Sequence, residues 1–328
     1  MAPVPVANFE INAVDPAQFR PGELARGAVH RLRLAAGPEE IPVLVVRGAE
    51  AGKTLAVTAG IHGDEYEGVR GILETVALLD PVIMRGDLLA VPVAHPAAFR
   101  ASQRTSPVDG LNLARVFPGN ASGKPTEVLA AALAELVIGR GDFYLDLHSG
   151  GRAYGMPSMA GYDLNDERSI AAARIFGAET IWGHANIPAG RTISYAQAQN
   201  IPWIYTEARG AQRIDREDLR MMQQGILNLL CHLEILPGQP VVRPIRCRLR
   251  GDGDTDRGIA ASESGFLLNR VHLLEEVSEG QILGVLVNML GEPLEEYRAP
   301  RAGAAALIHE FPIVQPGDSL YLIADRER

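Results

Sequence analysis

Two short stretches decide the fold of this chain: Gly60-Ile61-His62-Gly63-Asp64-Glu65 and Leu145-Asp146-Leu147-His148-Ser149-Gly150-Gly151. Each is joined to an apolar run, residues 54–59 in the first case and 143–147 in the second, and each run is followed by glycine. Such runs are typical of strands that are buried on both faces of a sheet. Ligands of open α/β sheets bind beyond the carboxyl ends of the strands. We therefore expect the polar residues of both stretches to meet at one edge of a sheet.

Those polar residues include His62, Glu65 and His148. Two imidazoles and one carboxylate are the protein ligands of a catalytic zinc site, which keeps its fourth position for water. A His-x-x-Glu pair is frequent by chance, but here a second histidine closes another apolar run. The sequence predicts one Zn²⁺ per chain, although cobalt, nickel or iron could occupy such a site in vitro. The alternative is that His62 caps a helix and that His148 is a hydrogen-bonded core residue.

Two further carboxylates belong to strands of the same kind. Asp146 precedes His148 by two residues and should share its strand face, where it could hold the second N–H of a metal-bound histidine. Its alternative is a buried ion pair with an arginine. Glu207 ends the apolar run 202–206, and a glutamate beside a metal-activated water can act as general base. From spacing alone, an ion pair between Glu207 and Arg209 is the simpler interpretation.

A long loop is expected over residues 96–124, and it contains Arg100, Arg104 and Arg115. Loops of this length inside a compact domain are usually functional. Arginine suits bidentate binding of a carboxylate and polarisation of a carbonyl oxygen. The alternative is that at least one of the three is a solvated surface residue.

The bulk composition limits the classes of function. The chain has 328 residues and a net charge of -9, which argues against nucleic acid and an anionic membrane as partners. No apolar run is long enough to span a bilayer, and the first six residues do not form a signal peptide. The two cysteines indicate no disulfide framework, so a cytoplasmic protein is expected. The sequence does not determine the oligomeric state, and a homo-oligomer is one possibility.

Hydrophobic periodicity predicts an α/β fold with a sheet flanked by helices, followed by a smaller C-terminal β-domain. Pro237-Gly238 is the expected boundary, with a catalytic domain over residues 1–237 and a β-rich domain over 238–328 that caps the site or mediates oligomerisation. The expected helices span residues 66–79, 126–138, 165–176, 192–199 and 216–236. The expected C-terminal strands span residues 271–274, 281–287, 305–308 and 320–323.

The C-terminal region contains two patterns that resemble known sites. Asp252, Asp254, Asp256 and Glu263 have the spacing of calcium ligands, but Arg257 stands where a calcium loop needs glycine, so a solvated acidic hairpin is expected. The turns of this region resemble a biotinyl- or lipoyl-type fold. The chain has no lysine after Lys124, which excludes a swinging-arm carrier.

Four motifs in order carry a resemblance to a known family: residues 59–65, 109–119, 146–151 and 206–207. They resemble the aspartoacylase and succinylglutamate desuccinylase family of the zinc carboxypeptidase clan, over about the first 235 residues. The resemblance implies a zinc carboxypeptidase-like fold in which His62, Glu65 and His148 hold zinc. It also implies that Glu207 is the general base and acid. In this pattern Arg104 polarises the scissile carbonyl and Arg115 binds a substrate carboxylate.

The chain departs from the family pattern at the substrate-binding loop. Ala114 stands where the family usually has asparagine, directly before Arg115. Asn112 lies two residues before Ala114, so it does not replace the missing amide, but it is a further candidate substrate-binding residue. Arg100 competes with Arg104 for the carbonyl-polarising role and is also a candidate for substrate binding.

The sequence therefore predicts a zinc-dependent amidohydrolase that cleaves the N-acyl amide of a small N-acylated amino acid. Within the family the chain resembles the deacetylases of N-acetylated diamino acids, such as N-acetyl-diaminobutyrate. One alternative is a metallocarboxypeptidase that acts on peptides, which an open groove would favour. The other is a non-catalytic metal- or metabolite-binding protein, which a Glu207 far from the metal would favour.

Overall fold

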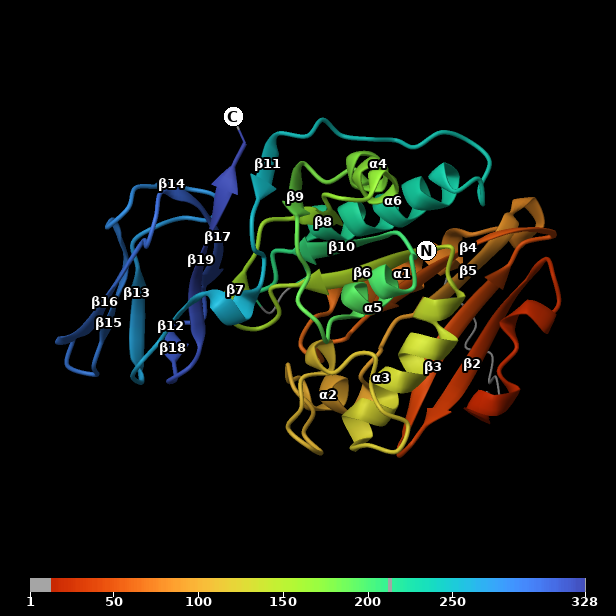
Figure 1. Ribbon diagram of the computed structural model, residues 1–328, viewed down its shortest axis with the longest axis horizontal. Coiled ribbons are helices and arrows are strands. Elements are labelled where there is room, and N and C mark those ends of the chain that lie inside the picture. Colours follow the sequence, from red (N-terminus) through yellow and green to blue (C-terminus); the bar gives the residue numbers. More distant parts are fainter. Residues whose placement is uncertain (1–12, 212–213, 328) are drawn as a thin grey trace, which may run out of the picture.

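A computed structural model describes residues 13–211 and 214–327, and one long mixed sheet forms its centre (Figure 1). The first six residues, on which the expected lack of a signal peptide rests, lie outside this part. The path of the sheet begins β1 (Ala13–Val14), β2 (Ala28–Ala36), β3 (Glu39–Arg47), β5 (Arg85–Val91), β4 (Glu50–Ala59), β6 (Phe143–Ser149), β10 (Trp203–Ala208), β8 (Met159–Asp163) and β9 (Thr180–His184). It continues with β11 (Cys247–Arg250), β19 (Ser319–Arg326), β17 (Gly303–His309) and β14 (Glu276–Val277), while β7 (Tyr154–Gly155) and β12 (Ile259–Ala260) pair beside this path.

Three neighbouring strands in the middle of the sheet are parallel. β4 pairs in parallel with β6, and β6 pairs in parallel with β10. β8 is antiparallel to β10, and β3 is antiparallel to β5, so the sheet is mixed as predicted. The carboxyl ends of β4, β6 and β10 thus meet at one edge, which is where the two motif stretches lie.

The helices cover both faces of this sheet (Figure 1). They are α1 (Glu67–Leu78), α2 (Pro96–Ala101), α3 (Pro125–Leu136), α4 (Glu167–Phe176), α5 (Thr192–Ala198) and α6 (Arg216–His232). α1, α4 and α6 share one buried cluster, and α3 and α5 share another. In β4, Leu55 and Val57 face the first cluster and Ala56 faces the second, which is the alternation expected of a strand covered on both sides.

The C-terminal region continues the sheet and adds a second one. β11 pairs in parallel with β9, and β19 pairs with β11. A separate four-stranded antiparallel sheet has the order β16 (Pro293–Arg298), β15 (Ile282–Val287), β13 (Gly265–Asn269) and β18 (Ile313–Val314). The smaller β-structure predicted at this end of the chain is therefore present.

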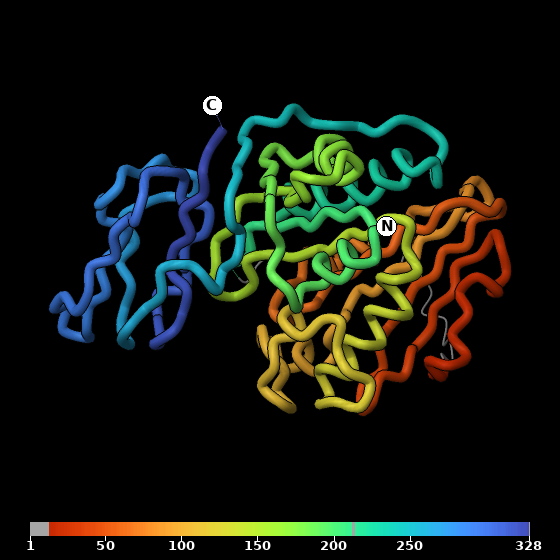
Figure 2. The backbone as a smooth tube through the Cα atoms, viewed as in Figure 1, coloured from red at the N-terminus to blue at the C-terminus, as the bar shows by residue number. Residues whose placement is uncertain are grey.

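The domain boundary at Pro237-Gly238 remains a prediction. These residues lie between α6 and β11, in a segment over 233–246 that contains no helix or strand. Figure 2 shows this segment crossing from the end of α6 to β11. One buried cluster joins the two sides, because it contains Trp182 of β9 together with Leu249 and Leu322.

Two local expectations are wrong. The loop predicted over 96–124 contains α2, whose Pro96 lies in the first turn, where its fixed φ favours a helix start. Residues 271–274 form a turn rather than a strand, because Leu274 has a left-handed φ of 64° that a strand does not accommodate. β13, just before that turn, is a further strand of the β-rich region that was predicted after residue 238. No described helix is long and apolar enough to cross a bilayer.

Candidate active site

The three predicted metal ligands lie together at the carboxyl ends of two parallel strands. His62 and Glu65 belong to the turn between β4 and α1, and His148 is near the end of β6. The register that pairs Ala59 with Leu147 brings this turn beside His148. Gly60 opens the turn with a left-handed φ of 62°, a conformation that glycine adopts at no steric cost.

The side chains of these residues converge on one point. Nδ1 of His62 lies 2.7 Å from Oε1 of Glu65, and Nδ1 of His148 lies 2.9 Å from Oε2 of the same carboxylate. One ligand atom from each residue lies within 4.8 Å of the other two, and no other such group of three occurs in the described parts of the chain. Two ring nitrogens that face a shared carboxylate fit the donor set and compactness of a zinc site.

Asp146 lies behind His148, on the side away from the converging atoms. Its carboxylate is 2.9 Å from Nε2 of His148, and it accepts hydrogen bonds from the hydroxyls of Thr58, at 2.7 Å, and Thr192. A carboxylate in this place holds the proton of His148 on Nε2 and leaves the lone pair of Nδ1 directed at the metal position.

The pKa values of the two histidines are shifted in opposite directions. Burial, aided by the guanidinium of Arg104, lowers the pKa of His62 to about 4, so its imidazole is neutral and able to bind a metal at pH 7. Burial also acts to lower the pKa of His148, but Asp146 and Glu65 outweigh it and raise that pKa well above the ordinary value. Without a metal, His148 therefore keeps a positive charge between two carboxylates, which is where a cation would be stabilised.

Glu207 lies across from His148 in the next strand. The two residues are direct register partners in the parallel pair β6–β10. Oε2 of Glu207 is buried and has no hydrogen-bond partner. Burial, reinforced by the charge of Glu65, raises the pKa of Glu207 to about 8. Such a group can exchange a proton near neutral pH.

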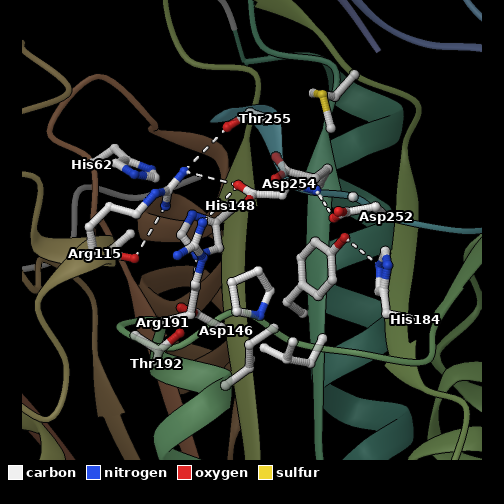
Figure 3. Close-up of a pocket in the computed structure, with 18 of the residues that line it drawn as sticks. His62, Arg115, Asp146, His148, His184, Arg191, Thr192, Asp252, Asp254 and Thr255 are labelled. Atoms are coloured by element: carbon white, nitrogen blue, oxygen red, sulfur yellow. Dashed lines mark hydrogen bonds and ion pairs between the residues drawn. The ribbon is translucent and has the colours of Figure 1, made fainter. Parts of the chain in front are cut away.

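Two of the three arginines considered in the loop, Arg104 and Arg115, line the same cavity. Nη1 of Arg104 donates to Oε1 of Glu65 at 3.1 Å, and its guanidinium lies 5.6 Å from the ring centre of Tyr154. Arg115 also lines this cavity and contacts residues of the C-terminal region, as Figure 3 shows.

Two of the predicted substrate-binding residues lie elsewhere. Arg100 is ion-paired with Glu39 at 2.9 Å and does not line the cavity, because α2 places its side chain beside β3. Asn112 accepts a hydrogen bond from the backbone N–H of Ala114 and caps a short helical turn over Leu113–Arg115. Ala114 itself does line the cavity.

Several lining residues were not anticipated from the sequence. They are Tyr205, Arg191, His184 and the segment 252–255. Figure 3 labels Arg191, His184, Asp252, Asp254 and Thr255 among them. His184 was expected to be an ordinary structural residue. Its Nδ1 donates to the carbonyl oxygen of Gly251 at 2.9 Å, and its Nε2 accepts from the hydroxyl of Tyr205 at 2.8 Å. Tyr205 precedes Glu207 by two residues on one strand face, which was a usable signal.

The acidic segment is neither a calcium loop nor a solvated hairpin. Asp252 is paired with Arg257, and Asp254 with Arg191, each at 2.7 Å. Asp254 is only 8 % exposed. Carboxylates held by arginines are not available to calcium. Instead, the segment forms one wall of a cavity of about 110 Å³.

Comparison with known proteins gives a consistent result. The model of the succinylglutamate desuccinylase/aspartoacylase catalytic domain matches residues 51–233. The N-alpha-acetyl-L-2,4-diaminobutyric acid deacetylase of Halomonas elongata is 33% identical over 299 residues, which cover 88% of this chain and 86% of that protein.

Two solved structures are similar to this protein along almost its whole chain. The product-bound ectoine utilization protein EutE (DoeB) from Ruegeria pomeroyi has 27% identity and a TM-score of 0.82, over 92% of this chain and 97% of its own. A succinylglutamate desuccinylase from Silicibacter sp. has 29% identity and a TM-score of 0.81, over 91% and 95%. The resemblance that the four motifs indicated is confirmed. This chain belongs to the succinylglutamate desuccinylase/aspartoacylase family.

Proposed function

We propose that this protein is a zinc-dependent amidohydrolase that removes the acyl group from a small N-acylated amino acid. The products are a carboxylic acid and a free amine. The observation that carries the proposal is the convergence of His62, Glu65 and His148 beside a buried carboxyl group, Glu207, that has no hydrogen-bond partner. The family and the deacetylase from Halomonas elongata support the same class of reaction.

The metal would be held by Nδ1 of His62, Nδ1 of His148 and the carboxylate of Glu65. Zinc in such a site supplies a Lewis acid for the amide carbonyl and makes water acidic enough to act as a nucleophile near neutral pH. Asp146 keeps His148 in the tautomer with its proton on Nε2, which leaves Nδ1 free to bind the metal.

Glu207 moves the proton. Its unpartnered Oε2 accepts the proton of the attacking water and later gives it to the nitrogen of the leaving amine. A pKa raised by burial suits both steps, since the group must hold the proton and release it within one cycle. A positive charge beside it would lower that pKa and favour the basic form before the attack.

Two arginines orient the substrate. Nη1 of Arg104 donates to Glu65, one of the three metal-binding residues, so its guanidinium is close enough to stabilise the negative charge that develops on the carbonyl oxygen. Arg115, which lines the same cavity, binds the substrate carboxylate in a two-pronged geometry. The roles of Arg100 and Asn112 in substrate binding are not retained, because both side chains are engaged elsewhere.

A small substrate fits the cavity better than a peptide does. The segment 252–255 forms one wall, and the volume of the cavity is about 110 Å³. The relative from Halomonas elongata is named for a substrate that carries an acetyl group on a diamino acid. We therefore place N-acetyl-L-2,4-diaminobutyrate first among the candidate substrates.

An amine-release screen tests this function. The zinc-loaded protein is incubated with N-acetyl, N-succinyl and N-formyl amino acids, and with a dipeptide series. Turnover of one acyl class without cleavage of dipeptides is the expected result. Cleavage of dipeptides alone would favour the carboxypeptidase alternative, and zinc binding without any turnover would favour a non-catalytic role.

A further inference from the structure

Arg115 is already bound to a carboxylate of the protein itself. Its Nε lies 2.7 Å from Oδ2 of Asp256, and its Nη2 lies 2.8 Å from Oδ1 of the same side chain. Nη2 also donates to Oγ1 of Thr255 at 3.3 Å, and Nη1 donates to the carbonyl oxygen of Ala114 at 3.2 Å. The two-pronged contact is the geometry with which an arginine binds the carboxylate of a ligand.

Asp256 contacts Arg115 although the two residues are 141 positions apart in the sequence. It belongs to a short helical turn, Thr255–Arg257, that lies between β11 and β12 of the C-terminal region. The neighbouring residues 252–255 line the cavity that also contains His62 and Glu207. The turn thus brings a carboxylate to the arginine that the proposed function assigns to the substrate.

Asp254 and Asp256 both pair with arginines that line this cavity, and they differ in how exposed their side chains are. Asp254 is 8 % exposed, pairs with Arg191 at 2.7 Å and accepts the backbone N–H of Asp256 at 3.2 Å. The side chain of Asp256 is 56 % exposed and, besides the contact with Arg115, accepts one longer hydrogen bond from Nη2 of Arg191 at 3.3 Å. The hydrogen bonds from Arg115 lower the pKa of Asp256, so it is an anion at pH 7. Asp254 therefore holds the turn in place. Asp256 is already largely hydrated, so moving its carboxylate from Arg115 into water costs little free energy.

We propose that Asp256 is a built-in competitor for the substrate carboxylate: it occupies Arg115 in the substrate-free protein and is displaced when a substrate binds. The proposal rests on the proposed function in so far as that function assigns Arg115 to the substrate. A ligand without a carboxylate cannot displace Asp256, so Asp256 makes the cavity selective for N-acyl compounds that carry one.

Asp256→Asn tests this exchange. Binding is measured by titration calorimetry on zinc-loaded protein in a Glu207→Gln background, so that the probe is not consumed. The probes are N-acetyl-L-2,4-diaminobutyrate and its α-carboxamide. Asp325→Asn is the matched control, because Asp325 is also exposed and paired with an arginine, Arg301, but lies outside the cavity.

Asp256→Asn is expected to bind the carboxylate probe about two- to fivefold more tightly, since exposed ion pairs of this kind shift an equilibrium by that order. The affinity of the carboxamide should not change, and Asp325→Asn should change neither. In an Arg115→Ala background the gain from Asp256→Asn should vanish, because the two residues act through one contact.

Equal or weaker binding of the carboxylate by Asp256→Asn would overturn the proposal and show that Asp256 only positions Arg115. Absence of carboxylate binding in every variant would overturn it as well. Failure of the proposed hydrolysis is a separate result, since it would appear as normal binding of the probe together with no amine release by the protein that retains Glu207.

Discussion

Glu207 is the residue on which the chemistry of the site depends most. It is buried opposite His148, and one of its carboxylate oxygens has no partner. Burial without a partner destabilises the charged form of a carboxyl group. The chain keeps this unfavourable arrangement next to a group of metal-binding residues, which is the pattern of a site built for proton transfer.

Glu207→Gln should therefore abolish amine release without loss of zinc. Removing a general base costs about 10²- to 10⁴-fold in rate, while the three metal-binding residues remain in place. The rate of amine release and the zinc content are measured on the same preparation. Glu310→Gln serves as the control and should keep full activity, because Glu310 is a partly buried glutamate paired with Arg209 that does not line the cavity. Substantial activity in Glu207→Gln would assign the base to another group.

The same substitution should stabilise the metal-free protein, and increasingly so as the pH rises. The unfolded chain loses the proton of Glu207 near its ordinary pKa of 4.5, whereas burial raises the pKa in the folded protein to about 8. Unfolding therefore releases a proton between these values, and stability falls as the pH rises through this window. Thermal unfolding in a chelator at pH 5, 7 and 9 should show a gain for Glu207→Gln that grows with pH. A gain that is independent of pH would contradict the assigned cause.

At the scale of elements, the site depends on the register of β4, β6 and β10. The parallel pairing of β4 with β6 aligns the two motif stretches, and that of β6 with β10 places Glu207 beside His148. α5 adds a further tie, since Thr192 at its start donates to Asp146. His148 is thus oriented through Asp146 by hydrogen bonds from a strand and a helix, while His62 and Glu65 lie in the turn between β4 and α1.

Asp146→Asn tests this orientation. An amide in place of the carboxylate should lower zinc affinity about 10- to 100-fold, because His148 loses the partner that fixes its tautomer. Affinity is measured by competition with a chromogenic chelator. Asp163→Asn is the control, since Asp163 is another buried aspartate at a strand end, bonded to Gln197 and not to a histidine. Equal zinc affinity in Asp146→Asn and the wild type would remove Asp146 from the site.

The elements that the sequence predicted best are those with a strong local pattern. The buried runs at β4 and β6 were evident from continuous apolar residues. The five helices that were predicted match α1, α3, α4, α5 and α6 to within a few residues at their ends, whereas α2 was not predicted. The convergence of His62, Glu65 and His148 followed from one physical rule about strand ends.

The contact of Arg191 with Asp254 was not foreseeable, because it joins residues 63 apart with no repeating pattern between them. The same holds for Arg115 and Asp256, which are 141 residues apart. Arg100 was misplaced because arginines of one loop cannot be ranked without knowing that Pro96 starts a helix.

On the scale of the whole molecule, the C-terminal region completes both the core and the cavity. Trp182 of β9 is buried in a cluster with Leu249, Leu307 and Leu322 of the C-terminal region. The turn at Thr255 supplies part of the cavity wall. The predicted boundary at Pro237-Gly238 therefore separates two regions of sequence that share one buried cluster.

A chain that ends at Pro237 should be poorly soluble. Truncation removes β11, leaves one side of β9 unpaired and exposes Trp182, and an uncovered apolar strand edge promotes aggregation. Soluble yield, gel filtration and the emission maximum of tryptophan measure the effect against the full chain. A soluble, monomeric fragment with a buried tryptophan would show that residues 1–237 fold independently.

The metal content of the purified protein tests the central claim most directly. Elemental analysis of the wild type is compared with that of His148→Ala and of His272→Ala, a histidine outside the site. About one zinc per chain in the wild type and in His272→Ala, with loss of zinc in His148→Ala, is the result that a site of two imidazoles and a carboxylate requires. Wild-type protein that binds no zinc, even after reconstitution, would contradict the metal site and the hydrolytic function built on it.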